Sequence, residues 1–290
     1  MKYLYYPGCS LESTAREYDA ATRAAMAALE VDLTEIEGWT CCGASAAEGY
    51  DERLALALPA VNLAIAETMT ASDDILVPCS ACYLNLKKAQ QAAATDAAAR
   101  ETINEILSVE SLQYTGRARP RHLLDIMSMD IGAQAVATRV TRRLDGLRIA
   151  PYYGCQSLRP YRVFDDPETP TSMDALIRAT GAEVHPWSMG NRCCGASHMT
   201  TKTEVGQQLV YRILKAARGA DAIATVCPMC QINLEGYQRR ISAKYHDAVR
   251  ISVIYLPQLL GAAMGVDAEK LDITDNLALF PELREQLVSN

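Results

Sequence analysis

Ten cysteines fall into two sets of five, and both sets have the same arrangement. In each set a Gly-Cys pair comes first, a Cys-Cys-Gly triplet follows, and a C-x-x-C pair ends the set. The spacings are C-x31-CC-x36-C-x2-C in the first half and C-x37-CC-x32-C-x2-C in the second. The first set is Cys9, Cys41, Cys42, Cys79 and Cys82, and the second set is Cys155, Cys193, Cys194, Cys227 and Cys230. This repeat predicts a duplicated chain in which each half builds one site from five thiols.

A chain of 290 residues is long enough for two domains of ordinary size, each with its own core. We therefore expect an N-terminal domain over residues 1–145 and a C-terminal domain over 146–290 that includes an amphipathic tail. Short β-prone runs alternate with helical patterns in both halves. This predicts an α/β fold with two pseudo-symmetric halves, each a small sheet flanked by helices. The cysteines are expected at strand ends and helix N-termini, where open α/β sheets place ligands.

The local patterns give approximate element boundaries. Strands are expected over residues 3–6, 31–37, 75–77, 148–153, 182–184 and 222–226. Helices are expected over 9–28, with Ser10 or Ser13 as a cap, and over 52–69, 83–94, 89–107, 122–140, 174–179, 204–217 and 232–242. Residues 116–120 are expected to form a turn-rich break.

Charge and hydropathy restrict the partners and the location. The net charge of −7, with scattered basic residues, argues against nucleic acid as a partner. The apolar runs are too short to span a bilayer, and the first residues are typical of a strand rather than a signal peptide. We therefore expect a cytoplasmic protein without membrane insertion. In a reducing cytosol, cysteines with a shared spacing more often bind metal or carry out redox chemistry than form disulfides.

Converging thiolates are soft ligands that favour zinc, copper(I) or iron–sulfur clusters. A structural zinc ion and a cubane cluster each take four ligands, whereas each set offers five. Either one thiol is spare or the centre is not an ordinary cubane. Adjacent cysteines such as Cys41 and Cys42 do not fit comfortably on one ion, but they can bind two neighbouring metals. The Cys-Cys pairs therefore favour a multi-iron cluster.

Three alternatives explain less of the pattern. A zinc site of Cys79, Cys82, Cys227 and Cys230 would leave six cysteines without a role. A thioredoxin-like C-x-x-C would have no Cys-Cys partner, and disulfides between adjacent residues are strained.

The glycines beside the cysteines are expected to adopt positive φ and to let the backbone approach a cluster; they are Gly8, Gly43, Gly154 and Gly195.

The duplicated five-cysteine pattern resembles that of the B subunit of heterodisulfide reductases. The resemblance covers nearly the whole chain and includes the segments 6–9, 77–82, 153–155, 164–168 and 256–260. It implies an iron–sulfur oxidoreductase with two non-cubane [4Fe–4S] clusters, one held by each set of five cysteines. It also implies that a disulfide bound between the clusters is split as each cluster passes one electron. The implied partners are the family's cubane-bearing C subunit and its flavin-bearing A subunit.

Other functions stay open. The reaction can run in either direction, and the substrate can be a small disulfide or thiol, a lipoyl-bound disulfide or sulfane sulfur, as in sulfur-oxidising relatives. The chain also resembles CCG electron-transfer proteins that work with fumarate, lactate or glycolate enzymes. A zinc- or cluster-bearing scaffold without turnover is a third class of function.

His198 follows Cys194 by four residues and is the candidate proton donor to a departing thiolate, because histidine titrates near neutral pH. A supporting or surface position is the alternative for this residue. The remaining histidines are expected to be structural: His122, His185 and His246.

Charged and aromatic residues near the cysteines have either binding or structural roles. Arg159 and Arg162 are candidates for attracting an anionic substrate or an acidic partner. Asp165, Asp166 and Glu168 are expected to form a loop and a helix cap rather than a metal site. The others are expected to be solvated charges (Lys87 and Lys88) or packing beside the clusters (Tyr5, Tyr6, Tyr152 and Tyr153).

Overall fold

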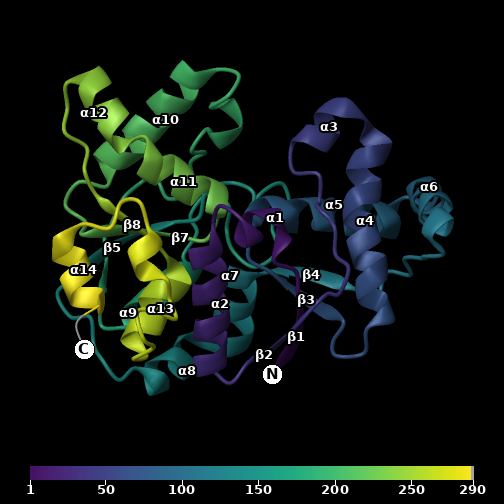
Figure 1. Cartoon of the computed structure of the whole chain (residues 1–290), viewed down its shortest axis with the longest axis horizontal. Coiled ribbons are helices and arrows are strands. Elements are labelled where there is room, and N and C mark those ends of the chain that lie inside the picture. Colours follow the sequence, from purple (N-terminus) through teal and green to yellow (C-terminus); the bar gives the residue numbers. More distant parts are fainter. Residues whose placement is uncertain (289–290) are drawn as a thin grey trace.

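Two four-stranded parallel sheets form the centre of the computed structural model, which describes residues 1–288 (Figure 1). The first sheet has the order β2-β1-β3-β4, with β1 (Lys2–Tyr5), β2 (Asp32–Glu35), β3 (Asp74–Val77) and β4 (Arg119–His122). The second has the order β6-β5-β7-β8, with β5 (Arg148–Tyr152), β6 (Glu183–Val184), β7 (Ala222–Thr225) and β8 (Ser252–Tyr255). Because the strand orders correspond, the sequence repeat is also a structural repeat, and the α/β prediction is confirmed.

Helices cover both sheets. Those of the first half are α1 (Gly8–Glu12), α2 (Arg16–Ala28), α3 (Ala46–Tyr50), α4 (Glu52–Thr68), α5 (Ser80–Thr95), α6 (Ala97–Leu107), α7 (Leu123–Asp125) and α8 (Gly132–Arg139). Those of the second half are α9 (Ser172–Ala179), α10 (Thr203–Ala216), α11 (Pro228–Gly236), α12 (Gln238–Tyr245), α13 (Leu256–Ala263) and α14 (Pro281–Val288). A π-helical stretch, Ile126–Ile131, joins α7 to α8.

The strand order creates a crevice in each half. From β1 the chain crosses to β2 on one side and returns to β3 on the other, so the connections after β1 and β3 diverge. Such a reversal leaves open space at the carboxyl ends of the two strands, where α/β proteins bind ligands. Cys9 and Cys79 follow β1 and β3, and Cys155 and Cys227 follow β5 and β7. The topology therefore directs both cysteine sets to the same kind of edge.

Two strands differ from the sequence-based expectation. The expected break over 116–120 ends in β4, whose Arg-Pro-Arg-His sequence lacks an apolar pattern. This strand lies at the edge of the first sheet, where proline is tolerated because one side needs no ladder hydrogen bonds. The other strand, β8, lies in the segment expected to be an amphipathic tail. The tail was expected to serve in packing or as a partner surface, and α13, in which all eight residues are buried, serves in packing and has no exposed polar face.

Some predicted helices are interrupted. The helix expected over 9–28 is divided into α1 and α2, and neither Ser10 nor Ser13 caps a helix start. Instead the Ser13 hydroxyl donates a hydrogen bond to the Cys9 carbonyl at 2.8 Å. The Ala-rich helix expected over 89–107 breaks at Asp96, whose carboxylate accepts N–H bonds at the start of α6. Residues 232–242 likewise divide between α11 and α12. At Asp96, a polar side chain that caps a new helix ends a propensity-based helix early.

The two halves share a hydrophobic core. Helix α2 of the first half packs against α13 of the second, and the two lie side by side in Figure 1. The rings of Tyr18 and Tyr255 stack across this contact with centroids 4.0 Å apart and planes 3° apart. One cluster of buried apolar side chains includes residues from both sheets. The division into domains over 1–145 and 146–290 stays a prediction, with residues 289–290 outside the described part of the chain.

Crossing a bilayer requires a helix of sufficient length and apolar composition. Within residues 1–288, no helix meets both requirements.

The Tyr18 stack generates a stability prediction. We expect Tyr18→Ala to lower the free energy of unfolding by about 3–5 kcal/mol, because it removes a fully buried aromatic ring at the contact between the halves. The matched control, Tyr50→Ala, removes a ring that is 86% exposed and should change the free energy by less than about 0.5 kcal/mol. Urea unfolding followed by circular dichroism measures both. Equal effects of the two substitutions would contradict a structural role for the stack.

Candidate metal centres

The structure brings the five cysteines of the first set together. The Cys42 and Cys82 sulfurs lie 3.4 Å apart, and the Cys9 and Cys41 sulfurs 3.9 Å apart. The charges of Cys42 and Cys79 act on both Cys82 and Cys9. The five thiols therefore form one group at the carboxyl ends of β1 and β3.

The second set converges in the same way. The Cys194 and Cys230 sulfurs are 3.5 Å apart. The charges of Cys193, Cys194 and Cys227 act on Cys155, and those of Cys194 and Cys227 act on Cys230. The two cysteine groups thus repeat each other as the sheets do.

The expected placement at strand ends and helix N-termini holds for only part of each set. Cys9 lies in the first turn of α1, Cys79 precedes α5, and Cys227 precedes α11. The Cys-Cys pairs instead occupy loops, between β2 and α3 and between β6 and the short 3-10 helix Ala196–His198. The loop after β2 in the first half, and the loop after β6 in the second, therefore forms one side of each crevice.

The sulfur spacing fits metal ligation. A metal–sulfur bond of about 2.3 Å and tetrahedral geometry separate two sulfurs by about 3.8 Å. The close pairs here span 3.4 to 3.9 Å, and all donors in both groups are thiols, which suit soft metals and iron–sulfur clusters. Among residues 1–288, no three His, Cys, Asp or Glu side chains are disposed to hold a single ion.

In the Cys42–Cys82 pair the two thiols differ in how readily they ionise. The hydrogen bond from Cys82 is the main cause that lowers the pKa of Cys42 to about 7, and the Ala44 N–H and Asn85 side chain add to it while burial opposes. The same pairing raises the pKa of Cys82. A thiol that ionises near neutral pH is prepared for metal binding, because the thiolate is the ligand.

The second half has two such thiols. The bond from Cys155 lowers the pKa of Cys193 to about 6, helped by the Gly195 N–H at 3.3 Å and by the charge of His198, and opposed by burial. For Cys227, the bond from Cys230 lowers the pKa to about 7 against burial, helped by backbone N–H groups of the first turn of α11 and by Ser80. These N–H groups belong to the first turn of α11, where the helix dipole favours an anionic sulfur.

Two glycines are required by the sulfur groups. Gly8 has φ +72°, and a Cβ there would lie 2.8 Å from the Cys82 sulfur. Gly154 has φ +70°, and its Cβ would lie 3.1 Å from the Cys230 sulfur. Gly43 and Gly195 also have positive φ, as predicted, but Gly43 approaches α3 and α4 and Gly195 approaches α10, instead of a sulfur. The expectation of close approach is thus right for the glycines before Cys9 and Cys155 only.

The Cys-Cys loops are fixed by matched pairs of polar side chains. The Tyr6 and Tyr152 hydroxyls each donate at 2.6 Å to the carbonyl of the residue that precedes a Cys-Cys pair. Asn85 and Asn233 donate to the carbonyls of the second cysteines at 3.0 and 2.9 Å. Neither asparagine was predicted from the sequence, although each stands three residues after the last cysteine of its set.

The two groups meet at the contact between the halves. The Ser80 hydroxyl lies 3.2 Å from the carbonyl of Val226, so the residue after Cys79 touches the residue before Cys227. Burial raises the pKa of Tyr18, and the charges of Cys227 and Cys79 raise it further, so this ring lies near both sets. The two cysteine groups are therefore neighbours.

The other singled-out residues mostly have structural partners. Arg159 bonds the Pro167 carbonyl and the Glu168 carboxylate, and Arg162 pairs with Asp166 at 2.9 Å. The Asp165 carboxylate accepts the Ser172 N–H at 2.8 Å at the start of α9, which confirms the loop and cap. Further partners are Glu48 for Lys88, Gln90 for Lys87, Asp19 for Tyr5, and the Met173 N–H for Tyr153.

The four histidines differ in position. His198 is exposed, and its charge acts on Cys193. His122 is fully buried at the end of β4, His185 follows β6, and His246 ends α12.

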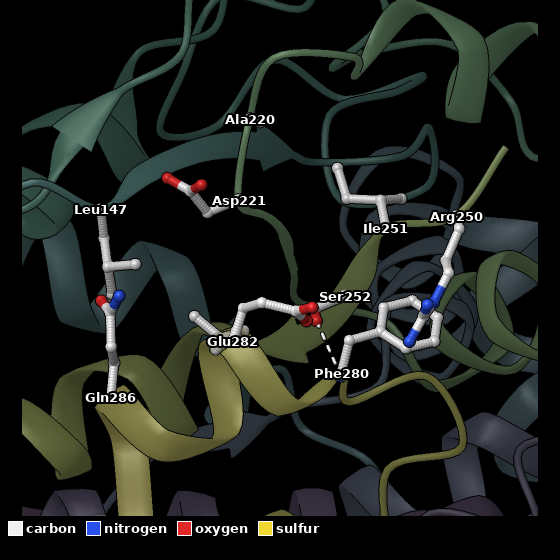
Figure 2. Close-up of a pocket in the computed structure, with 10 residues that line it drawn as sticks. Leu147, Ala220, Asp221, Arg250, Ile251, Ser252, Phe280, Glu282 and Gln286 are labelled. Atoms are coloured by element: carbon white, nitrogen blue, oxygen red, sulfur yellow. Dashed lines mark hydrogen bonds between the residues drawn. The ribbon is translucent and has the colours of Figure 1, made fainter.

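A cavity of about 280 Å³ lies apart from the cysteines, at the amino ends of β5, β7 and β8 (Figure 2). Arg250 lies over the Phe280 ring at 3.9 Å, and the Ser252 hydroxyl accepts the Phe280 N–H at 3.0 Å. Since all ten cysteines lie beyond the carboxyl ends of the strands, this cavity is not part of the cysteine sites.

The glycine geometry generates a prediction about metal binding. We expect Gly8→Ala to reduce the iron bound per chain at least about twofold, because its Cβ displaces the Cys82 sulfur. Gly38→Ala is the matched control: its φ is +74°, but nothing lies within 4 Å of its Cβ. Both variants should lose about 1–2 kcal/mol of stability from the left-handed backbone. Equal iron contents in the two variants would contradict the contact.

The short sulfur distances generate a second prediction. When the metal-free protein is oxidised, we expect disulfides between Cys42 and Cys82 and between Cys194 and Cys230, because these sulfurs start 3.4 and 3.5 Å apart. Peptide mapping by mass spectrometry after alkylation identifies the bridges. Preferential bridging within the C-x-x-C pairs would contradict the arrangement.

Comparison with known proteins gives a consistent family. The family model for the CCG cysteine-rich domain matches residues 3–87 and 149–235, more than half of the chain. The 8-methylmenaquinol:fumarate reductase membrane anchor subunit of Wolinella succinogenes is 32% identical over 280 residues, which cover 95% of this chain and 96% of that protein. The B subunit of the ferredoxin/F420H2-dependent CoB-CoM heterodisulfide reductase of Methanosarcina acetivorans is 29% identical over 284 residues, covering 95% of this chain and 93% of that protein.

A solved structure supports the fold alone. The crystal structure of a hypothetical protein from Helicobacter pylori superposes with a TM-score of 0.77 at 13% identity over 97% of this chain. The chain spans 52% of the length of that solved chain. Both matched segments and the full-length similarity show that this chain belongs to the CCG cysteine-rich domain family, carries the domain twice, and is homologous to the B subunits of heterodisulfide reductases.

Proposed function

We propose that this chain is the iron–sulfur subunit of an oxidoreductase complex, in which it reduces or forms a disulfide between two non-cubane [4Fe–4S] clusters. The observation that carries the proposal is the meeting of two five-thiol groups at Ser80 and Val226. The family and the all-thiol donor sets support iron–sulfur binding. Relatives named as subunits of reductases support a role within a larger assembly.

Each set would hold one cluster. Cys9, Cys41, Cys42, Cys79 and Cys82 would hold the first, and Cys155, Cys193, Cys194, Cys227 and Cys230 the second. When bound, each cluster supplies a one-electron redox centre next to the other. Reducing a disulfide consumes two electrons and two protons and yields two thiols. Two neighbouring centres therefore match the electron count of the reaction.

The chain's own groups would hold these ligands in place. The asparagine and tyrosine side chains described above fix the Cys-Cys loops by their carbonyls, and Gly8 and Gly154 leave room for the sulfurs behind them. The exposed His198, beside Cys193, is the proposed proton donor to a departing thiolate. Its position at the edge of the second set gives it access to solvent protons.

Electrons would reach this chain from partner proteins. We propose a cubane-bearing C subunit and a flavin-bearing A subunit as those partners, with a small disulfide, thiol or lipoyl group as substrate. The relatives support partner subunits in general, because they are named as parts of multi-subunit reductases.

A second candidate function is electron transfer to or from a fumarate-, lactate- or glycolate-linked enzyme. The similarity to part of a fumarate reductase, at 32% identity over 95% of this chain, favours it specifically. In that function the cysteine groups would carry electrons without binding a disulfide.

The deciding experiment uses protein purified without oxygen. We expect about eight irons per chain, since two four-iron clusters are bound, and oxidation of reduced viologen by one of a panel of disulfides. Cys42→Ser and Cys194→Ser should each lose iron and at least about tenfold of this activity. Val109→Ala, at a side chain that is 82% exposed, is the control and should keep both.

The alternatives give different results. Zinc in place of iron, or well under eight irons per chain, would rule out the two-cluster proposal. A full iron content without reduction of any disulfide, together with electron exchange with a fumarate-type partner enzyme, would favour the second candidate.

A further inference from the structure

Helix α11 is open to solvent where its counterpart in the first half, α5, is covered. Both helices begin directly after the first cysteine of a C-x-x-C pair. None of the first nine residues of α5, 80–88, is exposed. Of the nine residues of α11, three are exposed: Met229, Ile232 and Gly236. The same face of the repeat is therefore accessible in the second half and inaccessible in the first.

Two large apolar side chains occupy the open face of α11. Met229 is 42% exposed and Ile232 is 41% exposed, and a spacing of three residues makes them neighbours on one side of the helix. In the first half Leu84, at the position equivalent to Ile232, is only 8% exposed. Met229 stands between Cys227 and Cys230, which are both buried. The second cysteine set therefore lies directly beneath an exposed apolar pair.

The part of the chain around this pair is basic. Residues 192–245 contain eight Lys and Arg residues against three Asp and Glu residues, although the whole chain has a net charge of −7. Three of these cations pair with nearby carboxylates. The other five are exposed and have no carboxylate partner within residues 1–288; they are Arg192, Lys202, Arg212, Arg239 and Arg240.

The unpaired cations and the apolar pair belong to one layer of the fold, which α10, α11 and α12 form in Figure 1. Helix α12 begins two residues after α11 ends, so Arg239 and Arg240 lie about two turns beyond the apolar pair. The Asn233 side chain donates to the Cys194 carbonyl at 2.9 Å. This bond holds the Cys-Cys loop, and with it Arg192, against α11. The layer therefore has an apolar centre with cations on two sides.

The corresponding area of the first half has the opposite charge. After its Cys-Cys loop the exposed ring of Tyr50, at 86%, lies among the exposed carboxylates of Glu48, Asp51 and Glu52 and one exposed cation, Arg53. Charge complementarity across an interface attracts the right partner, and like charges reject the wrong one. An acidic partner is therefore attracted to the second half and repelled by the first.

We propose that the exposed face of α11, with Met229 and Ile232 at its centre and Arg192, Arg239 and Arg240 around it, is the docking surface of an acidic one-electron carrier protein. An apolar centre inside a polar rim is typical of protein interfaces. The inference rests on the proposed function, because it takes the second cysteine set as a redox centre. The docked carrier donates one electron to that centre, and no bond forms or breaks. Electrons therefore enter this chain through its second half.

The test measures electron transfer from a reduced acidic bacterial ferredoxin to the full chain, purified without oxygen, by stopped-flow spectroscopy. We expect a second-order rate constant that falls as salt is added, because salt screens the attraction. Arg239→Glu combined with Arg240→Glu should lower this rate constant at least about tenfold, since steering contributes about 10- to 1,000-fold. Ile232→Glu should lower it about tenfold as well, because it places a charge in the apolar centre.

The matched control is Arg53→Glu combined with Arg100→Glu. It makes the same change in net charge at two exposed arginines of the first half that have no carboxylate partner in the described part of the chain. It should keep the rate constant within about twofold, because charges far from the contact are screened. Reduced viologen is a small cation that needs no docking surface, so disulfide reduction driven by it should be the same in all variants.

The outcomes separate this inference from the proposed function. Equal losses in the two double variants, or no electron transfer from the ferredoxin to the wild-type chain, overturn the inference, and viologen-driven disulfide reduction then leaves the function intact. A wild-type chain without iron overturns both. If the Arg239 and Arg240 variant loses binding to phosphatidylglycerol vesicles but keeps its rate of electron transfer, the surface binds anionic lipid and the inference is overturned.

Discussion

The constraint on which this structure depends is the gathering of ten thiols into two tight groups. Two thiolates about 4 Å apart repel each other by about 4 kcal/mol at an effective dielectric of about 20, so five cannot all ionise without a cation among them. In the absence of metal the strain is relieved by sharing protons: Cys42 ionises easily while Cys82 retains its proton. A bound metal centre removes this conflict, which makes metal binding and thiol convergence one physical problem.

Both halves of the fold gather their five thiols by the same arrangement of strands, helix starts and loops. In each half a strand-order reversal opens a crevice, a C-x-x-C pair at a helix start supplies one side, and a loop with adjacent cysteines supplies the other. The loop is held through its carbonyls by Asn85 and Tyr6, and in the second half by Asn233 and Tyr152. These bonds fix the loops through backbone acceptors, and Asn85 also donates to the Cys42 sulfur at 3.8 Å.

Duplication also creates the contact at which the halves can diverge. The ring stack of Tyr18 and Tyr255 and the shared apolar core keep the two groups adjacent. At the same contact the repeat is broken, because Ser80 and His122 stand where the other half has proline and tyrosine. The two halves of the repeat therefore differ at the boundary between the two cysteine groups.

The sequence alone determined the two cysteine sets, the α/β class and most elements, because cysteine spacing and apolar periodicity are properties of the sequence itself. It did not reveal β4, since Arg119–His122 has no apolar pattern and becomes a strand only by pairing with β3. Nor did it assign Asn85 and Asn233, whose partners lie about 40 residues away, or separate the roles of Gly8 and Gly43. The link from Ser80 to Val226 was decided by the tertiary structure, because only the packing of one half on the other brings these groups within hydrogen-bonding distance.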